Sequence, residues 1–187
     1  MRRLIIAAMI FFTLGVIGWF SPDIQPVQAQ GDATWQVQYF DNLYFLGNPV
    51  LTETRDEVNL DWGTGSPGSG VPADNFTARV STDVFFPAGS YRFYMLADDG
   101  ATVTFNFQSE VIDTFYQPRP GEIISGDITV DRASVYHIQI DYRELEGEAY
   151  LYFDYESTAD GVTGPDFPPQ TPSGGSTSGC TAPSSRT

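Results

Sequence analysis

The sequence predicts an all-β protein, an antiparallel sandwich or barrel. From about Trp35 to Tyr155, short runs of aromatic and β-branched residues are broken at regular intervals by Gly, Pro, Asn and Asp, a spacing typical of such folds. No window of a dozen residues has a helical period, so short helical turns are the most that we expect.

Four runs alternate in a way that predicts strands with one buried and one solvated face. The expected inward-facing sets are Tyr91, Phe93, Met95 and Ala97; Ala101, Val103, Phe105 and Phe107; Tyr136, Ile138, Ile140 and Tyr142; and Ala149, Leu151, Phe153 and Tyr155. Residues from Gly63 to Pro72 are expected to form a surface loop. Their match to a glycine-rich dinucleotide-binding pattern is discarded, because Pro67 and Pro72 forbid the helix that such a site needs.

The first 29 residues are predicted to be a signal peptide. Arg2 and Arg3 precede an uncharged run from Leu4 to Phe20, and Val27-Gln28-Ala29 has the small-residue spacing of a cleavage site. An uncleaved membrane anchor is the alternative, since the apolar run is nearly long enough to span a bilayer. We therefore expect a secreted or cell-surface protein, without membrane insertion once the leader is removed.

The net charge of the chain limits the classes of partner that it is expected to bind. Without residues 1–29 the chain keeps seven arginines and no lysine against 23 acidic residues, a formal net charge near −16. Such a surface repels nucleic acid and anionic lipid and suits neutral ligands or cations such as calcium. Cys180 is the single cysteine, so no internal disulfide is expected.

The predicted domain covers residues 30–157. From Ser157 onward the chain holds five Pro, five Gly, six Ser and six Thr but almost no large apolar side chain, so residues 158–187 are expected to be a linker or tail.

Asp98-Asp99-Gly100 is the most informative tripeptide, because adjacent carboxylates repel each other unless a positive charge separates them. Calcium would supply that charge and accept oxygens from neighbouring loops. The alternative is a solvated hairpin turn, for which Asp-Gly is well suited.

The region from residue 35 to residue 155 resembles the protective-antigen-14 domain family, a β-sandwich of bacterial toxins, glycosidases and fungal flocculation adhesins. The order and spacing of several segments support the resemblance: Asn75-Phe76-Thr77-Ala78-Arg79-Val80, Phe86-Pro87-Ala88-Gly89-Ser90-Tyr91-Arg92-Phe93, Ala97-Asp98-Asp99-Gly100, Val111-Ile112-Asp113 and Gly147-Glu148-Ala149-Tyr150-Leu151.

The resemblance implies that Asp98 and Asp99 are joined by a cis peptide and hold a calcium ion that takes sugar hydroxyls. In similar sugar-binding members, a second loop supplies an asparagine. The corresponding stretch here, residues 142–147, has none, and Glu144 or Glu146 could provide the oxygen instead. The expected ligand-binding residues are thus Asp98, Asp99, Glu144 and Glu146, with Asp98 and Asp99 as metal ligands.

Other chemistry-bearing residues are given structural roles. Arg79 lies opposite an apolar strand face and is expected to form an ion pair with a carboxylate. His137 has no second histidine for a zinc site and is expected to be an exposed strand residue. No nucleophile elbow or metalloprotease motif is present, so no catalytic activity is expected.

The leading functional hypothesis is therefore a carbohydrate-binding, lectin-like module whose partner is a glycan or polysaccharide, with selectivity set by loops around residues 63–75 and 142–147. The alternatives are a non-sugar structural or protein-interaction module at the cell surface, and an accessory domain of a glycoside-hydrolase system.

Overall fold

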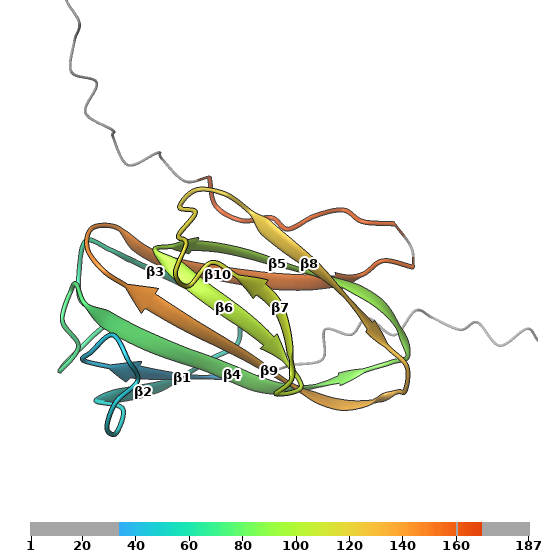
Figure 1. Cartoon of the computed structure of the whole chain (residues 1–187), viewed down its shortest axis with the longest axis horizontal. Coiled ribbons are helices and arrows are strands. Elements are labelled where there is room, and N and C mark those ends of the chain that lie inside the picture. Colours follow the sequence, from blue (N-terminus) through green and yellow to red (C-terminus); the bar gives the residue numbers. More distant parts are fainter. Residues whose placement is uncertain (1–33, 160, 170–187) are drawn as a thin grey trace, which may run out of the picture.

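The computed structural model describes residues 34–159 and 161–169. These residues form two antiparallel sheets stacked as a sandwich, and none of them is helical, which confirms the all-β prediction (Figure 1). The strands are β1 (Trp35–Phe40), β2 (Leu51–Arg55), β3 (Val58–Gly63), β4 (Phe76–Phe86), β5 (Gly89–Asp98), β6 (Gly100–Phe105), β7 (Ser109–Asp113), β8 (Ile124–Val130), β9 (Ser134–Glu144) and β10 (Ala149–Ser157).

Strands distant in the chain are neighbours in both sheets. The six-stranded sheet has the order β2-β1-β4-β9-β6-β7, and the four-stranded sheet has the order β3-β10-β5-β8. The longest pairing joins β4 to β9, in a register that places Phe76 opposite Glu144 and Phe86 opposite Ser134. Because β5 and β6 belong to different sheets, residues 98–100 connect the two layers.

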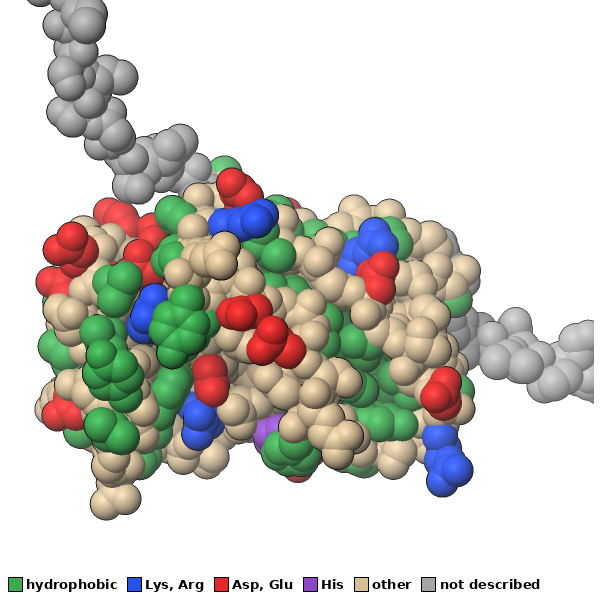
Figure 2. Space-filling model, in the orientation of Figure 1, with side chains coloured by type: hydrophobic (Ala, Val, Ile, Leu, Met, Phe, Trp, Pro, Cys, Tyr) green, Lys and Arg blue, Asp and Glu red, His purple; other side chains and the backbone are tan. Residues whose placement is uncertain are grey.

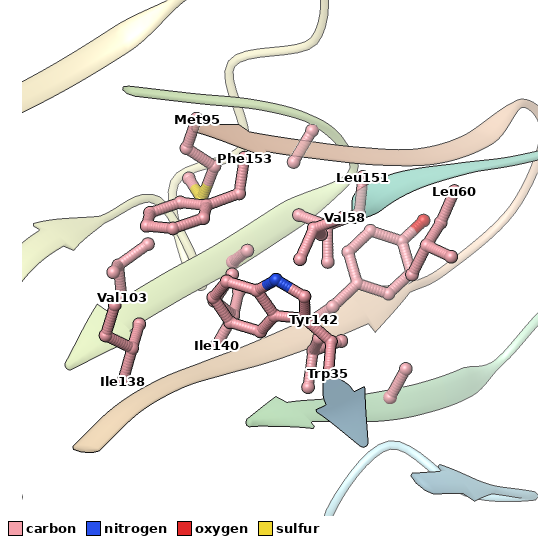
Figure 3. Packing of buried hydrophobic residues seen from close by; sticks show 14 of the residues in the cluster. Trp35, Val58, Leu60, Met95, Val103, Ile138, Ile140, Tyr142, Leu151 and Phe153 are labelled. Carbon is pink, nitrogen blue, oxygen red and sulfur yellow. The ribbon is translucent and has the colours of Figure 1, made fainter. Parts of the chain in front are cut away.

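The core lies between the sheets, where side chains from both layers meet (Figure 3). The expected inward-facing residues of β5, Tyr91, Phe93, Met95 and Ala97, are all buried there. Tyr94 and Leu96 on the opposite face are buried as well, so the expectation of a solvated outer face is wrong for this strand. In β9, Ile138, Ile140 and Tyr142 are fully buried.

One predicted core residue is exposed. Phe107 is 71% exposed, because β6 ends at Phe105 and Asn106 and Phe107 turn the chain with φ values of 52° and 62°. Its ring instead stacks on His137, with centroids 4.2 Å apart. His137 is accordingly only half-exposed, and its Nδ1 lies 2.7 Å from Asp83 Oδ1, so the expectation of a simply exposed histidine is wrong.

Arg79 forms the predicted ion pair. Its Nε and Nη2 donate to the two carboxylate oxygens of Asp141 at 2.7 and 2.9 Å, and its guanidinium lies 4.8 Å from the ring centroid of Phe45. This bidentate pair joins β4 to β9 on the outer face of the sheet, a structural role.

The four-stranded sheet is buried on both faces over part of its area. Leu96, Tyr150 and Tyr152 form a second apolar cluster on its outer side, and Phe167 packs against them. Glu156 binds the segment that leads to Phe167, accepting hydrogen bonds from Thr163 and Gly164 at 2.8 to 3.0 Å. We call residues 161–168 the C-terminal strap. The strap belongs to the stretch that was expected to be a linker or tail after residue 157, and here it contacts the sandwich.

The predicted leader, Cys180 and the end of the predicted tail lie outside the described residues. Within residues 34–159 and 161–169, there is no helix with the length and apolar character needed to cross a bilayer. Acidic side chains are spread over the face shown in Figure 2 rather than gathered in one patch.

Candidate functional site

Asp98-Asp99-Gly100 lies at one end of the sandwich, where the chain passes from one sheet to the other. β5 ends at Asp98 in the four-stranded sheet, opposite Tyr150, and β6 begins at Gly100 in the six-stranded sheet, opposite Arg143. The interpretation of this tripeptide as a solvated hairpin turn is therefore wrong, because β5 and β6 are not paired and Asp98 is only 8% exposed.

Gly100 is required by a close approach of two backbone segments. A Cβ atom at this position would lie 2.6 Å from the carbonyl oxygen of Thr114 and 2.7 Å from that of Phe115. The glycine that suggested a turn instead lets the loop after β7 pack against the crossing. The Asp98–Asp99 peptide bond is cis, as the resemblance implied.

The carboxyl group of Asp98 is held in an unfavourable environment for a negative charge. Burial, followed by the charges of Asp99 and Glu148, raises its pKa to about 6. Its backbone carbonyl oxygen accepts a hydrogen bond from the hydroxyl of Tyr142.

Asp99 links the crossing to the loop after β9. Its Oδ2 accepts a hydrogen bond from the backbone N–H of Leu145 at 2.6 Å. The same loop is tied to the segment before β4, because Asn75 N–H donates to the Leu145 carbonyl at 3.1 Å and Gly147 N–H donates to Asp74 Oδ1 at 3.2 Å. Three separate stretches of chain thus meet around the acid pair.

Glu144 is fully buried at the end of β9. Its Oε2 lies 2.7 Å from the hydroxyl oxygen of Tyr142, whose single proton is shared between this carboxyl group and the Asp98 carbonyl, while its Oε1 is buried and has no partner among the described residues. Burial raises the pKa of Glu144 to about 8, and the charges of Asp99, Asp98 and Asp74 add to this, against the opposing effect of the Tyr142 hydrogen bond.

The structure thus brings Glu144 into electrostatic contact with Asp98 and Asp99, whereas Glu146 is exposed on the loop two residues further on. Burial and the unpartnered Oε1 of Glu144 favour a proton or a cation at this point. The described residues contain no group of three or more His, Cys, Asp and Glu side chains placed to hold a metal ion by themselves. An ion here would therefore need carbonyl, water or ligand oxygens as well, which calcium accepts.

An aromatic rim beside the acid pair was not predicted. Arg143 lies between Phe115 and Tyr116, with its guanidinium 4.8 and 4.9 Å from their ring centroids, and Nη2 donates to the Phe115 carbonyl at 2.7 Å. Tyr116 is 75% exposed, whereas Phe115 is buried. The only signal in the sequence is the Phe-Tyr pair after Asp113-Thr114, and nothing in the sequence places that pair beside Gly100.

A comparison with protein families identifies the family of this fold. The family model of the PA14 domain matches residues 33–166. This chain belongs to the PA14 domain family. The predicted resemblance is thereby confirmed, and the match extends nine residues beyond position 157, to include most of the C-terminal strap.

Solved structures share the sandwich of this PA14 domain at low sequence identity. An anti-sigma factor domain-containing protein from Clostridium clariflavum is 21% identical, with a TM-score of 0.57 over 68% of this chain and 42% of that one. A β-glucosidase from Kluyveromyces marxianus is 12% identical, with a TM-score of 0.56 over 67% of this chain and 17% of that one.

A structure described as the PA14 sugar-binding domain from an RTX adhesin is 16% identical, with a TM-score of 0.53 over 71% of this chain and 93% of that one. The chain spans less than half of the length of the anti-sigma factor domain-containing proteins that it matches. No curated protein matches the sequence.

Proposed function

We propose that this PA14 domain is a calcium-dependent carbohydrate-binding module without catalytic activity of its own. The observation that carries the proposal is the buried, unpartnered Oε1 of Glu144 beside the Asp98–Asp99 pair at the crossing between the sheets. Asp98 and Asp99 would supply side-chain oxygens to the ion, and carbonyl, water or sugar oxygens would complete its coordination, while Glu144 and Glu146 stay predicted ligand-binding residues beside it.

The charges of these residues favour a divalent cation over other partners. Burial, followed by the charges of neighbouring acids, raises the pKa of both Asp98 and Glu144, so each carboxylate gains stability when a positive charge lies nearby. Calcium bound there would supply that charge and leave coordination positions for the hydroxyl groups of a sugar.

The chain's own residues would orient the sugar. Tyr116 exposes an aromatic ring at the rim, fixed by Arg143, and aromatic faces pack well against the apolar faces of sugar rings. The end of β9 and the loop after it (residues 142–147) contact the end of the segment of residues 63–75, because Gly147 N–H donates to Asp74 Oδ1. These loops are the proposed determinants of sugar selectivity.

The name of one similar structure, the PA14 sugar-binding domain from an RTX adhesin, supports this proposal. The predicted leader and the acidic composition support a location outside the cell, where calcium is abundant and a glycan partner is accessible. The proposal therefore includes secretion or attachment to the cell surface.

The test combines calcium calorimetry with a glycan array on protein lacking the expected leader, residues 30–187. The unchanged protein should take up calcium near pH 8 and bind glycans only when calcium is present. Asp99→Asn and Glu144→Gln should each weaken calcium binding by about tenfold or more, because Asp99→Asn removes a charged ligand and Glu144→Gln removes a negative charge beside the ion. Glu110→Gln is the matched control, since Glu110 is exposed on β7.

Equal array signals with and without chelator would overturn the calcium dependence. An absence of both calcium uptake and glycan binding in correctly folded protein would instead favour the structural or protein-interaction module.

A further inference from the structure

A second cleft lies away from the acid pair, on the four-stranded sheet. It has a volume of about 590 Å³ and is bounded by the start of β3, the C-terminal half of β10 and the C-terminal strap. None of its lining residues belongs to the site at the sheet crossing. Asp154, on its floor, lies four positions along β10 from Tyr150, the residue that pairs with Asp98.

The charged lining of this cleft is entirely negative. Asp56, Glu57, Asp154 and Asp166 contribute carboxylates, and no arginine lines the cleft. Among the described residues, the ion pairs do not include any of these four acids. Arg55, the neighbour of Asp56 in the chain, is instead bound to Glu53 at 2.9 Å.

Aromatic rings form much of the remaining lining. Trp35 contacts Phe153 edge to face, with centroids 5.6 Å apart, and both labelled residues can be followed in Figure 3. On the strap, Phe167 lies 6.0 Å from Tyr152. A ligand in the cleft would therefore meet apolar surface as well as negative charge.

Asp154 is the acid of the cleft whose negative charge is least favourable in the absence of a cation. It is half-buried, and burial, aided by the charge of Glu156, raises the pKa of its carboxyl group. Its Oδ1 accepts a hydrogen bond from the backbone N–H of Tyr155 at 2.8 Å, which opposes that rise. A cation in the cleft would remove the remaining penalty.

The chemistry of the lining distinguishes between kinds of cation. Among the residues that the structure describes, the acids are not grouped closely enough to hold a metal ion. An extended cation with an apolar stem fits better, because its charge can reach separate carboxylates while its stem packs on the rings. The guanidinium group has this character, since it is planar, stacks on aromatic faces and binds carboxylates bidentately.

We propose that this cleft, between β3, β10 and the C-terminal strap, is a docking site for an arginine side chain presented by a partner protein. Asp154 and Asp56 receive the guanidinium group, and Trp35 and Phe167 contact its stem. The site is separate from the proposed sugar site and does not depend on calcium.

The test is a nuclear magnetic resonance titration of ¹⁵N-labelled protein, residues 30–187, in chelator. The probe is the peptide acetyl-Gly-Arg-Gly-amide, and its control is the same peptide with citrulline, which has nearly the same shape without the charge. The arginine peptide should shift the Trp35 indole and the backbone signals of Asn59, Asp154 and Phe167 in a saturable manner. The citrulline peptide should shift them at least about threefold more weakly, the difference expected for an exposed charge pair.

Two variants test whether the arginine peptide binds in the cleft. Asp154→Asn should weaken binding of the arginine peptide by about three- to tenfold, whereas Asp131→Asn, which makes the same charge change outside the cleft, should leave it unchanged. Equal binding of both peptides, shifts confined to other residues, or an unaffected Asp154→Asn variant would each overturn the proposal. Calcium or a neutral oligosaccharide that shifts these signals while the arginine peptide does not would also overturn it.

Discussion

The two carboxyl oxygens of Glu144 have different surroundings. Oε2 is hydrogen-bonded to the hydroxyl group of Tyr142, whereas Oε1 is buried without a hydrogen-bond partner among the described residues. A neutral acid tolerates that position better than a carboxylate does, unless a cation is present. The protonation of this one residue therefore affects the stability of the sandwich when calcium is not bound.

We expect the calcium-free domain to lose stability as pH rises from about 5 to about 8. The pKa of Glu144 is raised from 4.5 to about 8, so the folded state keeps a proton that the unfolded chain releases. The stabilisation is complete below about pH 4.5 and is lost as pH approaches about 8, a change on the order of a few kcal/mol. Asp98 adds to the fall up to about pH 6.

Urea denaturation in chelator at several pH values measures this slope. Glu144→Gln should flatten it between about pH 6 and 8, because glutamine does not titrate there. Glu110→Gln should retain it. A wild-type domain that gained stability over the same pH range in chelator would contradict the assignment.

At the scale of elements, alternation predicted much of the structure, since β5, β9 and β10 turn the residues that their two-residue period selected toward the core, with Tyr136 and Tyr155 only partly buried against it. The crossing at Asp98 was harder to predict. Asp-Gly suits a tight turn, and strand periodicity does not tell which sheet the following strand joins. Phe107 was misplaced for a related reason, because the period does not show where a strand ends.

The C-terminal strap is an element that composition concealed. Its proline and glycine content predicted a tail. In the structure, Phe167 packs against Leu96, Tyr150 and Tyr152, and Glu156 holds the backbone that leads to Phe167 through hydrogen bonds.

For the candidate site, the acid pair and Glu144 were predicted from the sequence. Tyr142, Arg143 and Tyr116 were not, because their places depend on pairings across the sheets.

We expect a protein that ends at Ser157 to be less stable than one that ends at Pro169, by about 1 to 3 kcal/mol, because it loses the Phe167 contact and the Glu156 hydrogen bonds. Thermal unfolding of the two proteins measures the difference. Phe167→Ala in the longer protein should reproduce part of the loss. Identical unfolding temperatures for both lengths would show that the strap contributes nothing to stability.

At the scale of the whole molecule, charge is the dominant feature. The chain has a formal net charge of −15 and only nine arginines, and acidic side chains occur across the face shown in Figure 2. Repulsion among them opposes the compact state at low ionic strength.

Sodium chloride should therefore stabilise the domain in chelator. Raising its concentration from about 0.02 to about 0.5 M shortens the screening length severalfold, and we expect the unfolding temperature to rise by a few degrees. Differential scanning fluorimetry at fixed pH measures the effect. Sucrose at matched osmolality is the control, since it does not screen charge. A fall in unfolding temperature with salt would mean that the ion pairs of the surface outweigh the repulsion.

The passage of the chain between layers at residues 98–100 has a mechanical consequence. An ion bound to Asp98 on one sheet, and attracted by the charge of Glu144 on the other, would fasten the two layers together at this end of the sandwich. The same ion that is proposed to bind a sugar would then also strengthen the domain against tension. Adhesion to a glycan-bearing surface and mechanical resistance to unfolding would both depend on the bonds to this ion.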